Sequence, residues 1–422
     1  MTALVLALHR RTFSSLRRHR NYRIFFTGQV ISVSGSWMQN VALAWLVLEL
    51  SHSPLAVGVL AFCRFLPFTA FGLIAGWVTD RVETRRLLVF TQAAQLLLAA
   101  ALAALALTGT ATLSVVLVLA ALGGVALVFD APGRQTLTFQ LVGERELPNA
   151  VALNSSLFNA SRILGPAIAG LLIAAVGVGA CFAVNAVSFL AVLTSLLVLR
   201  ESELFGVTRT APRSMVAGVR EGLAFVKRTR MLVIVLGVVT VLSVAGFNFH
   251  VIVPLLASDT LHLGPEAFGF LAAAFGAGAL AGALAAAALA RASRRAFLLG
   301  TAGFGATMLA LAPVESVWLC AVMLFGVGVS FTLLTANANA LVQLATPPEL
   351  RGRVLGLYLF AFAGLAPVGG LLAGWLVEVG GTELSFAIAG LTALLTTAVA
   401  ARAWPVAAAT RSGVEPAVAA GR

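Results

Sequence analysis

The stretch GWVTDRVETRR, Gly76 to Arg86, places a cluster of charges directly after a long apolar run. The charged members are Asp80, Arg81, Glu83, Arg85 and Arg86. Such a cluster stands out because the chain of 422 residues is 60% hydrophobic and only 10% charged. A soluble protein of this length could not bury so much apolar surface, and the sequence therefore predicts the lipid bilayer as its solvent.

The apolar runs predict an all-α membrane protein with twelve transmembrane helices, because one spanning helix needs about 20 mostly apolar residues. Runs of that size begin near Ile24, Pro54, Leu87, Thr112, Asn149, Ala180, Met231, Pro265, Ala296, Ser316, Val354 and Leu384. Short polar gaps such as Thr108 to Thr110 indicate tight hairpins between neighbouring spans.

The basic residues behind the net charge of +12 fall in alternate gaps between the runs, as at Arg81 to Arg86 and Arg200 to Arg230. The remaining gaps, such as Asp259 to Glu266, contain no Lys or Arg. The positive-inside rule therefore predicts that both termini are cytoplasmic. Since no basic stripe is interleaved with exposed aromatic residues, we expect no nucleic-acid partner.

An internal repeat divides the chain into halves. Arg85-Arg86 fall on Arg294-Arg295 at an offset of 209, and Pro54 falls on Pro265 at 211. Two pseudo-symmetric six-helix bundles, related by an axis along the membrane normal, explain this order. We expect a cytoplasmic segment 1–23, a first bundle 24–199, a cytoplasmic linker 200–230, a second bundle 231–404 and a cytoplasmic tail 405–422.

The opening stretch resembles the signature of the major facilitator superfamily in the loop between the second and third spans. The match rests on Gly76, Asp80, Arg81, Arg85 and Arg86, whereas Glu83 stands where glycine is usual. The stretches FDAPGRQ (Phe129–Gln135) and ELPNAVALNS (Glu146–Ser155) resemble the drug and siderophore exporter branch of that superfamily, which includes enterobactin exporters and macrolide efflux proteins.

The signature predicts a cytoplasmic latch between the halves. Gly76 lacks a side chain and permits close helix contact, and Asp80 can accept hydrogen bonds from free amides at a helix N-terminus. The resemblance implies that this helix begins near Gly352. The alternative is an ordinary basic loop. The second copy, Ala290 to Arg295, has no acid, so we expect one strong latch.

Three ionisable residues lie well within the predicted spans at similar depth: Arg64, Asp130 and Arg162. Such residues are costly and usually face a partner or a water-filled cavity. We expect Asp130 to pair with Arg162 or Arg64, either as a proton-responsive switch or as a permanent ion pair. The spare positive charge favours an anionic or catecholate-like group on the substrate, or a third partner that the sequence does not identify.

The resemblance implies that the first, fourth, seventh and tenth spans line the substrate cavity. Near mid-depth these spans offer Trp37, Met38, Gln39, Asn40, Phe129, Phe247, Asn248, His250, Phe331 and Asn337. Aromatic walls with a few amides suit a bulky amphiphile better than a sugar. The alternative is that these aromatic side chains pack against lipid or neighbouring helices.

The fifth span carries GPAIAG, whose Gly165, Pro166 and Gly170 resemble the antiporter signature. The resemblance implies close packing on the eighth span, where FGAGALAG (Phe275–Gly282) is rich in small residues.

These features predict a secondary exporter of an amphiphilic small molecule, driven by proton antiport and alternating access. We expect a monomer in a bacterial cytoplasmic membrane, with the proton gradient in place of a cofactor and no metal. An importer or lipid flippase of the same fold, and a non-transporting receptor, are the alternatives. An enzyme is not expected, because no nucleophile, base or metal set is clustered among five scattered histidines.

Overall fold

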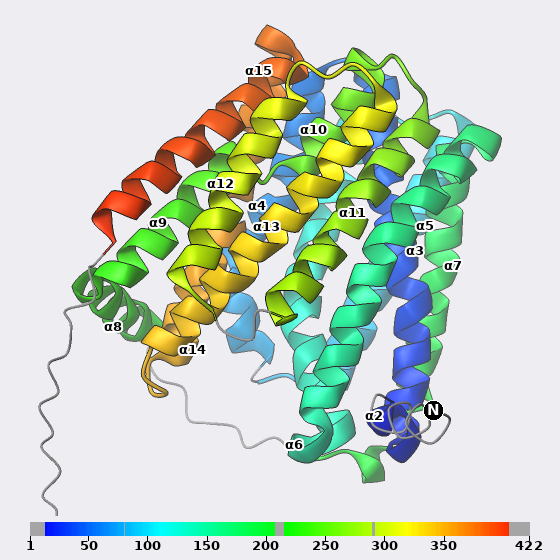
Figure 1. Ribbon diagram of the computed structural model, residues 1–422. Coiled ribbons are helices and arrows are strands. Elements are labelled where there is room, and N and C mark those ends of the chain that lie inside the picture. Colours follow the sequence, from blue (N-terminus) through cyan, green and yellow to red (C-terminus); the bar gives the residue numbers. More distant parts are fainter. Residues whose placement is uncertain (1–12, 80, 207–214, 289–291, 405–422) are drawn as a thin grey trace, which may run out of the picture.

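The structure, a computed structural model, describes residues 13–79, 81–206, 215–288 and 292–404 (Figure 1). Every regular element in these ranges is helical. In the first half of the chain the helices are α2 (Ser14–Arg18), α3 (Arg20–Ser51), α4 (Pro54–Thr79), α5 (Thr84–Thr108), α6 (Leu113–Val176) and α7 (Val178–Leu197). The connection to the second half contains η1 (Glu201–Glu203) and α8 (Met215–Arg228).

In the second half the helices are α9 (Arg230–Ala245), α10 (Phe249–Leu255), η2 (Leu256–Thr260), α11 (Pro265–Ala288), α12 (Arg294–Leu311), α13 (Val317–Ala345), α14 (Arg351–Leu359), η3 (Phe360–Gly364) and α15 (Ala366–Ala403). The segments η2 and η3 are short π-helical turns. They connect α10 to the following loop and α14 to α15.

Two helices are too long to cross a bilayer once. At about 1.5 Å per residue, the 64 residues of α6 would extend about 96 Å, against a hydrocarbon core of about 30 Å. The chain turns sharply at Gly143, whose φ of 68° and ψ of 177° are accessible almost only to glycine. In α15 the turn falls at Gly380 and Gly381, and the φ of Gly381 is 70°.

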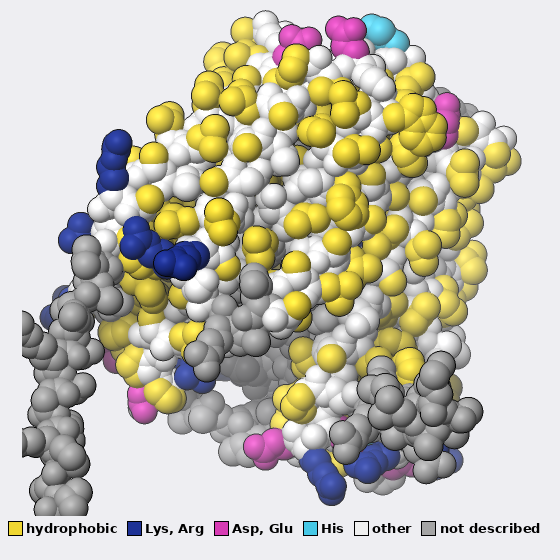
Figure 2. All heavy atoms as spheres, in the orientation of Figure 1, with side chains coloured by type: hydrophobic (Ala, Val, Ile, Leu, Met, Phe, Trp, Pro, Cys, Tyr) yellow, Lys and Arg dark blue, Asp and Glu magenta, His cyan; other side chains and the backbone are white. Residues whose placement is uncertain are grey.

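Among the described residues, nine helical segments are long and apolar enough to cross a membrane. The expectation of an all-α membrane protein is confirmed. The number of twelve spans stays a prediction, since two of these segments contain the glycine turns and α12 is not among the nine. On the face shown in Figure 2, apolar side chains cover the middle of the molecule and charged side chains gather at its ends.

Packing between helices falls into two groups with two main links between them. In the first group α3 packs on α6 and α7, and α5 packs on α7. In the second group α11 and α12 pack on α13, and α9 packs on α15. The links are α4 with α15 and α6 with α11. This grouping is consistent with two bundles, whose bounds 24–199 and 231–404 remain predictions.

Glycines bring the linked helices together at one end of the molecule. A Cβ on Gly58 of α4 would lie 2.7 Å from the carbonyl oxygen of Gly370, and a Cβ on Gly170 of α6 would lie 2.6 Å from that of Pro265. These distances leave no room for side chains, so the backbones are in direct contact. We call this the acidic end, because Glu266 and Glu378 lie beside these contacts.

At the opposite end, which we call the basic end, the described parts of the linked helices stand apart. A Cβ on Gly72 of α4, or on Gly352 or Gly356 of α14, would meet nothing within 4 Å. Figure 2 shows the surface hollowed at this end, between the regions of α14 and the turn of α6 in Figure 1. The two groups of helices are therefore closed at the acidic end and open at the basic end.

Candidate functional site

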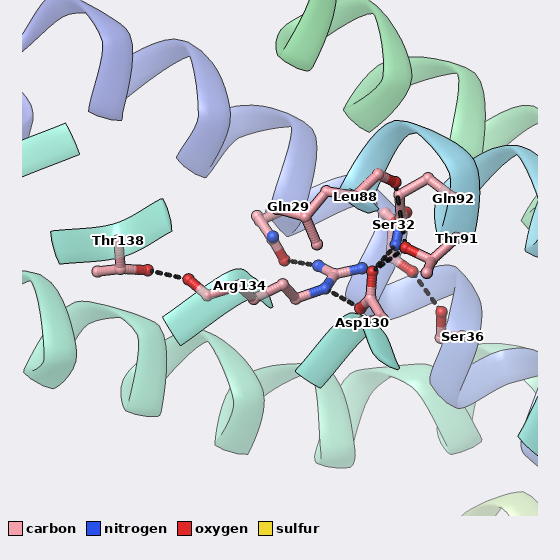
Figure 3. Close-up of polar contacts among 9 residues, drawn as sticks. All are labelled: Gln29, Ser32, Ser36, Leu88, Thr91, Gln92, Asp130, Arg134 and Thr138. Carbon is pink, nitrogen blue, oxygen red and sulfur yellow. Dashed lines mark hydrogen bonds and ion pairs between the residues drawn. The ribbon is translucent and has the colours of Figure 1, made fainter. Parts of the chain in front are cut away.

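Asp130 lies at the centre of a buried polar network within the first group of helices (Figure 3). Its side chain is 1% exposed. Its Oδ1 accepts hydrogen bonds from Thr91 Oγ1 at 2.9 Å and Gln92 Nε2 at 2.6 Å, both on α5. Its Oδ2 pairs with the guanidinium of Arg134, one turn further along α6. Two neutral donors and one cation thus surround this carboxylate.

The expectation that Asp130 pairs with Arg162 or Arg64 was wrong. Its partner is Arg134, whose Nη1 also donates to Gln29 Oε1 on α3 (Figure 3). The available signal was the spacing of four residues within FDAPGRQ, which places both side chains on one face of a helix.

Some buried polar atoms on α3 and α5, the helices beside Asp130, are not hydrogen-bonded in the described part of the chain. Ser32 Oγ, Gln92 Oε1 and Gln95 Nε2 are buried and have no hydrogen-bond partner in the described part of the chain. Buried polar groups are nearly always hydrogen-bonded, and internal water commonly supplies the missing bonds. These atoms lie on α3 and α5, the helices that contribute Gln29 and Thr91 to the Asp130 network.

Arg162 occupies a different environment, between the two groups of helices. Its guanidinium carbon lies 4.6 Å from the ring centroid of Phe275 on α11, and 5.8 to 5.9 Å from those of Phe331 and Trp37. Cation–π contacts contribute up to about 2 kcal/mol each when desolvated, yet they leave the N–H donors unused. Within the described ranges, Arg162 has no side-chain hydrogen bond and no carboxylate partner.

Arg64 lies on α4, and its Nη2 donates to Asn40 Oδ1 of α3. Its guanidinium carbon lies 5.9 Å from the ring centroid of Phe65. The rings of Phe65 and His250 are 4.9 Å apart and meet edge to face. Among the described residues Arg64, like Arg162, has no carboxylate partner.

A cluster of phenylalanines from the second group of helices lies beside these arginines. We call it the aromatic cluster, and its members are Phe247, Phe249, Phe275, Phe304, Phe331 and Phe362. Phe249 and Phe275 approach to 4.2 Å between ring centroids, and Phe331 contacts every other member. Of the predicted cavity residues, Phe247 and Phe331 belong to this cluster, and Trp37 reaches it through Arg162.

The other predicted cavity residues mostly have local packing partners. Gln39 Oε1 accepts from Asn185 Nδ2 at 2.6 Å, and Met38 is buried. Asn337 donates to the carbonyl oxygen of Leu333 at 2.8 Å, and buried Asn248 donates to that of Val244 at 2.9 Å. Phe129 is partly buried.

The glycines of the fifth predicted span face two different helices. Gly170 meets α11 at Gly269, and Pro166 contributes the carbonyl oxygen 2.5 Å from a Cβ on Gly269. Gly165 instead faces α3 beside Trp37. Within the stretch Phe275–Gly282, Gly276 faces α6, whereas Gly278 and Gly282 face α13. The expected close contact of the fifth span with the eighth is therefore present at Gly170 and Gly276, whereas Gly278 and Gly282 pack on α13.

The predicted latch lies partly outside the described residues. Asp80 lies outside the described residues and the surroundings of Gly76 are not described, whereas Arg81 has an interaction partner. Arg85 pairs with Glu201 at 2.5 Å and donates to the carbonyl oxygens of Leu196 and Leu197. Arg86 pairs with Glu83 at 2.5 Å.

The helix expected to face the latch has another partner at the basic end. Arg353 of α14 pairs with Glu221 of α8, and a Cβ on Gly222 would lie 3.2 Å from Cβ of Arg353. The linker helix α8 therefore packs on the beginning of α14.

Comparisons with known proteins agree with this fold. The family model described as a transmembrane secretion effector of the MFS type matches residues 11–416. The multidrug efflux pump Tap of Mycolicibacterium fortuitum is 32% identical over 382 residues, covering 87% of this chain and 91% of that protein. Macrolide efflux protein A of Streptococcus pyogenes is 22% identical, covering 89% and 95%.

Solved structures share the fold at low sequence identity. A peptide transporter of the POT type in complex with sulfate matches with a TM-score of 0.76 at 14% identity, covering 91% of this chain and 94% of that one. The nucleoside transporter NupG matches with a TM-score of 0.75 at 12% identity, covering 91% and 99%.

Proposed function

Because the chain belongs to the MFS-type transmembrane secretion effector family, we propose that it is a proton-driven exporter of amphiphilic small molecules. The family supports transport as the activity. The efflux pumps among the relatives favour export over import or lipid flipping, and their names favour drug-like substrates. Siderophores remain within the proposed class through the resemblance of FDAPGRQ and its neighbouring stretches.

The observation that carries proton coupling is the buried Asp130–Arg134 pair. Asp130 is the only Asp or Glu of the described residues that is buried within the apolar part of the bundle, and Arg134 is 22% exposed. Protonation of Asp130 would remove the negative charge that pairs with Arg134. Arg134 would then keep only its hydrogen bond to Gln29. Because an ion pair and a protonated acid favour different neighbours, protonation would change the relative stability of two conformations.

Alternating access is the proposed mechanism, with the present structure as its inward-facing state. This proposal places the basic end and both termini in the cytoplasm of a bacterium, following the positive-inside rule. Contact at the acidic end and separation at the basic end support it. We propose that the protein acts as a monomer, since each group of helices contributes to one aromatic and cationic centre.

In the opposite state we propose that Asp80 binds the beginning of α14 and closes the basic end. Arg353, near the beginning of α14, pairs with Glu221 of the linker helix α8 in the present structure. Asp80→Asn is expected to raise the inward-facing population, measured by accessibility of single cysteines at the two ends. Equal accessibility in both proteins would reject the latch.

The coupling proposal is tested with Asp130→Asn. A panel of macrolides, dyes and catecholates is first compared in cells with and without the gene, to find a transported compound. Transport of that compound is then measured in inside-out vesicles with an imposed pH gradient. We expect Asp130→Asn to abolish the response to the gradient, while Glu315→Gln, which removes an exposed acid, leaves it unchanged.

Gradient-driven transport at the unmodified rate in Asp130→Asn would show that the Asp130–Arg134 pair is a permanent structural ion pair. Accumulation outside the vesicle rather than inside would instead identify an importer, because the orientation of the chain is reversed in these vesicles.

A further inference from the structure

Two membrane-embedded arginines have charges that no carboxylate of the described residues neutralises. Arg134 differs from them, because its partner Asp130 lies one turn away. Arg64 donates one hydrogen bond to Asn40, whereas the guanidinium of Arg162 lies against aromatic rings. A cation in a low-dielectric region is costly unless it meets an anion or water, so these two positions are expected to serve a ligand.

The donors of Arg162 are within reach of a ligand. Buried nitrogen and oxygen atoms without a hydrogen-bond partner in the described part of the chain include Arg20 Nη1 and Asn248 Oδ1, but no atom of Arg162. Arg162 is partly buried and makes no side-chain hydrogen bond to the described residues, so its guanidinium has donors left for a ligand. The surrounding rings come from α3, α11 and α13, so the accessible space lies between the two groups of helices.

Arg64 and Arg162 flank the same element, the first turn of α10. On one side the guanidinium of Arg64 lies 5.9 Å from the ring of Phe65, which meets the ring of His250 at 4.9 Å. On the other side Phe249, the residue before His250, packs at 4.2 Å on Phe275, which also receives Arg162. On α3, the contacts of the two arginines, Asn40 and Trp37, are three residues apart and lie on one face.

The geometry points to an anionic amphiphile as the substrate class: a carboxylate, sulfonate or phenolate held by Arg64 and Arg162, with an aromatic body against Phe249, Phe275 and Phe331. Guanidinium groups are planar multiple donors that match such oxyanions. This inference rests on the proposed transport function, since it assigns the ligand of that site. Because both arginines belong to the first group of helices and most of the rings to the second, the ligand would contact both groups.

The alternative is that cation–π contacts alone hold the two arginines, as packing elements without a ligand. In that case a neutral aromatic compound would bind as well as an anionic one. A matched pair of probes separates these cases: 8-anilinonaphthalene-1-sulfonate, and N-phenyl-1-naphthylamine, which lacks only the sulfonate. Binding is measured by calorimetry on the full chain in nanodiscs, without any gradient, with empty nanodiscs as the blank.

We expect the sulfonate to bind about 10-fold or more tightly than the neutral amine, as charge-assisted hydrogen bonds in such a site commonly contribute. Arg162→Gln and Arg64→Gln are each expected to weaken sulfonate binding by about 10-fold and to leave the amine unchanged. Arg162→Lys keeps the charge and should retain most of the binding. Arg145→Gln, at the exposed turn of α6, removes the same charge elsewhere and should have no effect.

Equal affinity of the two probes for the unmodified chain would overturn the inference. So would unchanged sulfonate binding in both glutamine variants, or an equal loss of both probes, which would indicate a packing defect. Thermal unfolding of each variant identifies a folding failure. If Arg162→Gln fails to fold, Arg162→Lys, which keeps the charge, is the variant whose binding of the two probes tests the inference. Because the binding measurement uses no gradient, a negative result there would not contradict proton-driven export. Conversely, intact binding without gradient-driven transport in the unmodified chain would contradict only the proposed function.

Discussion

A single methyl group at Gly58 is expected to destabilise the conformation seen here. The Cβ of an alanine would lie 2.7 Å from the carbonyl oxygen of Gly370 and 3.1 Å from Cα of Gly374. Ordinary contact begins at 3.4 Å, so α4 and α15 must separate by about 0.7 Å, the difference between 3.4 and 2.7 Å. Both neighbours are backbone atoms, which cannot rotate away.

Overpacking of this kind costs about 1–3 kcal/mol, which changes a ratio of two populations by about 5-fold to 150-fold. The cost applies to the conformation closed at the acidic end and is relieved when α4 and α15 separate. Gly58→Ala is therefore expected to favour the state open at the acidic end. The matched control is Gly72→Ala on the same helix, where a Cβ meets nothing within 4 Å.

The assay is pulsed electron spin resonance between spin labels at Leu50 and Val379, both exposed beside the α4–α15 contact. Cys63, Cys181 and Cys320 are replaced first, so that only the introduced cysteines are labelled. Gly58→Ala should add a population with a longer distance, and Gly72→Ala should not. Identical distance distributions in both variants would refute the reasoning, because the contact would then carry no conformational preference.

Two further predictions concern the basic end. Gly143→Ala is expected to lower stability by about 1–3 kcal/mol, since φ of 68° with ψ of 177° strains any side chain, and its Cβ would also lie 3.0 Å from the ring of Phe205. Thermal unfolding checks this against Gly123→Ala on α6, which meets open space; equal midpoints would contradict it. At Glu146, the hydrogen bond from Ser14 and the charge of Arg18 lower the carboxyl pKa despite its burial. Because the folded pKa is depressed, this stabilisation is fully present above the ordinary value of 4.5 and is lost as the pH falls through the lower folded pKa. The protection of the α2 amides, measured as the exchange rate relative to the intrinsic rate at each pH, should therefore fall on acidification in the unmodified chain and stay constant in Glu146→Gln; the same pH response in both would contradict it.

The charged residues of the candidate site could be predicted from the sequence around each of them. Their contacts with other helices could not. Asp130, Arg64 and Arg162 were identified because a charge within an apolar run is conspicuous in any sequence. Their partners were not identified correctly, because depth in the membrane says nothing about the direction of a side chain around its helix. The pairing of Asp130 with Arg134 was accessible from their spacing on one helix, whereas the bonds from Thr91 and Gln92 required the packing of α5 on α6.

The sequence by itself determined that this chain is a helical membrane protein of the major facilitator type, because hydrophobic run length and a short loop signature are local properties. Only the tertiary structure decided that Gln39 pairs with Asn185 while Trp37, two residues earlier, faces Arg162. Successive residues of a helix point in directions about 100° apart, so neighbours in the chain face different helices. Which of them meet the aromatic cluster depends on how α3 is rotated against α6, α7 and α11, and that rotation results from packing across the whole molecule.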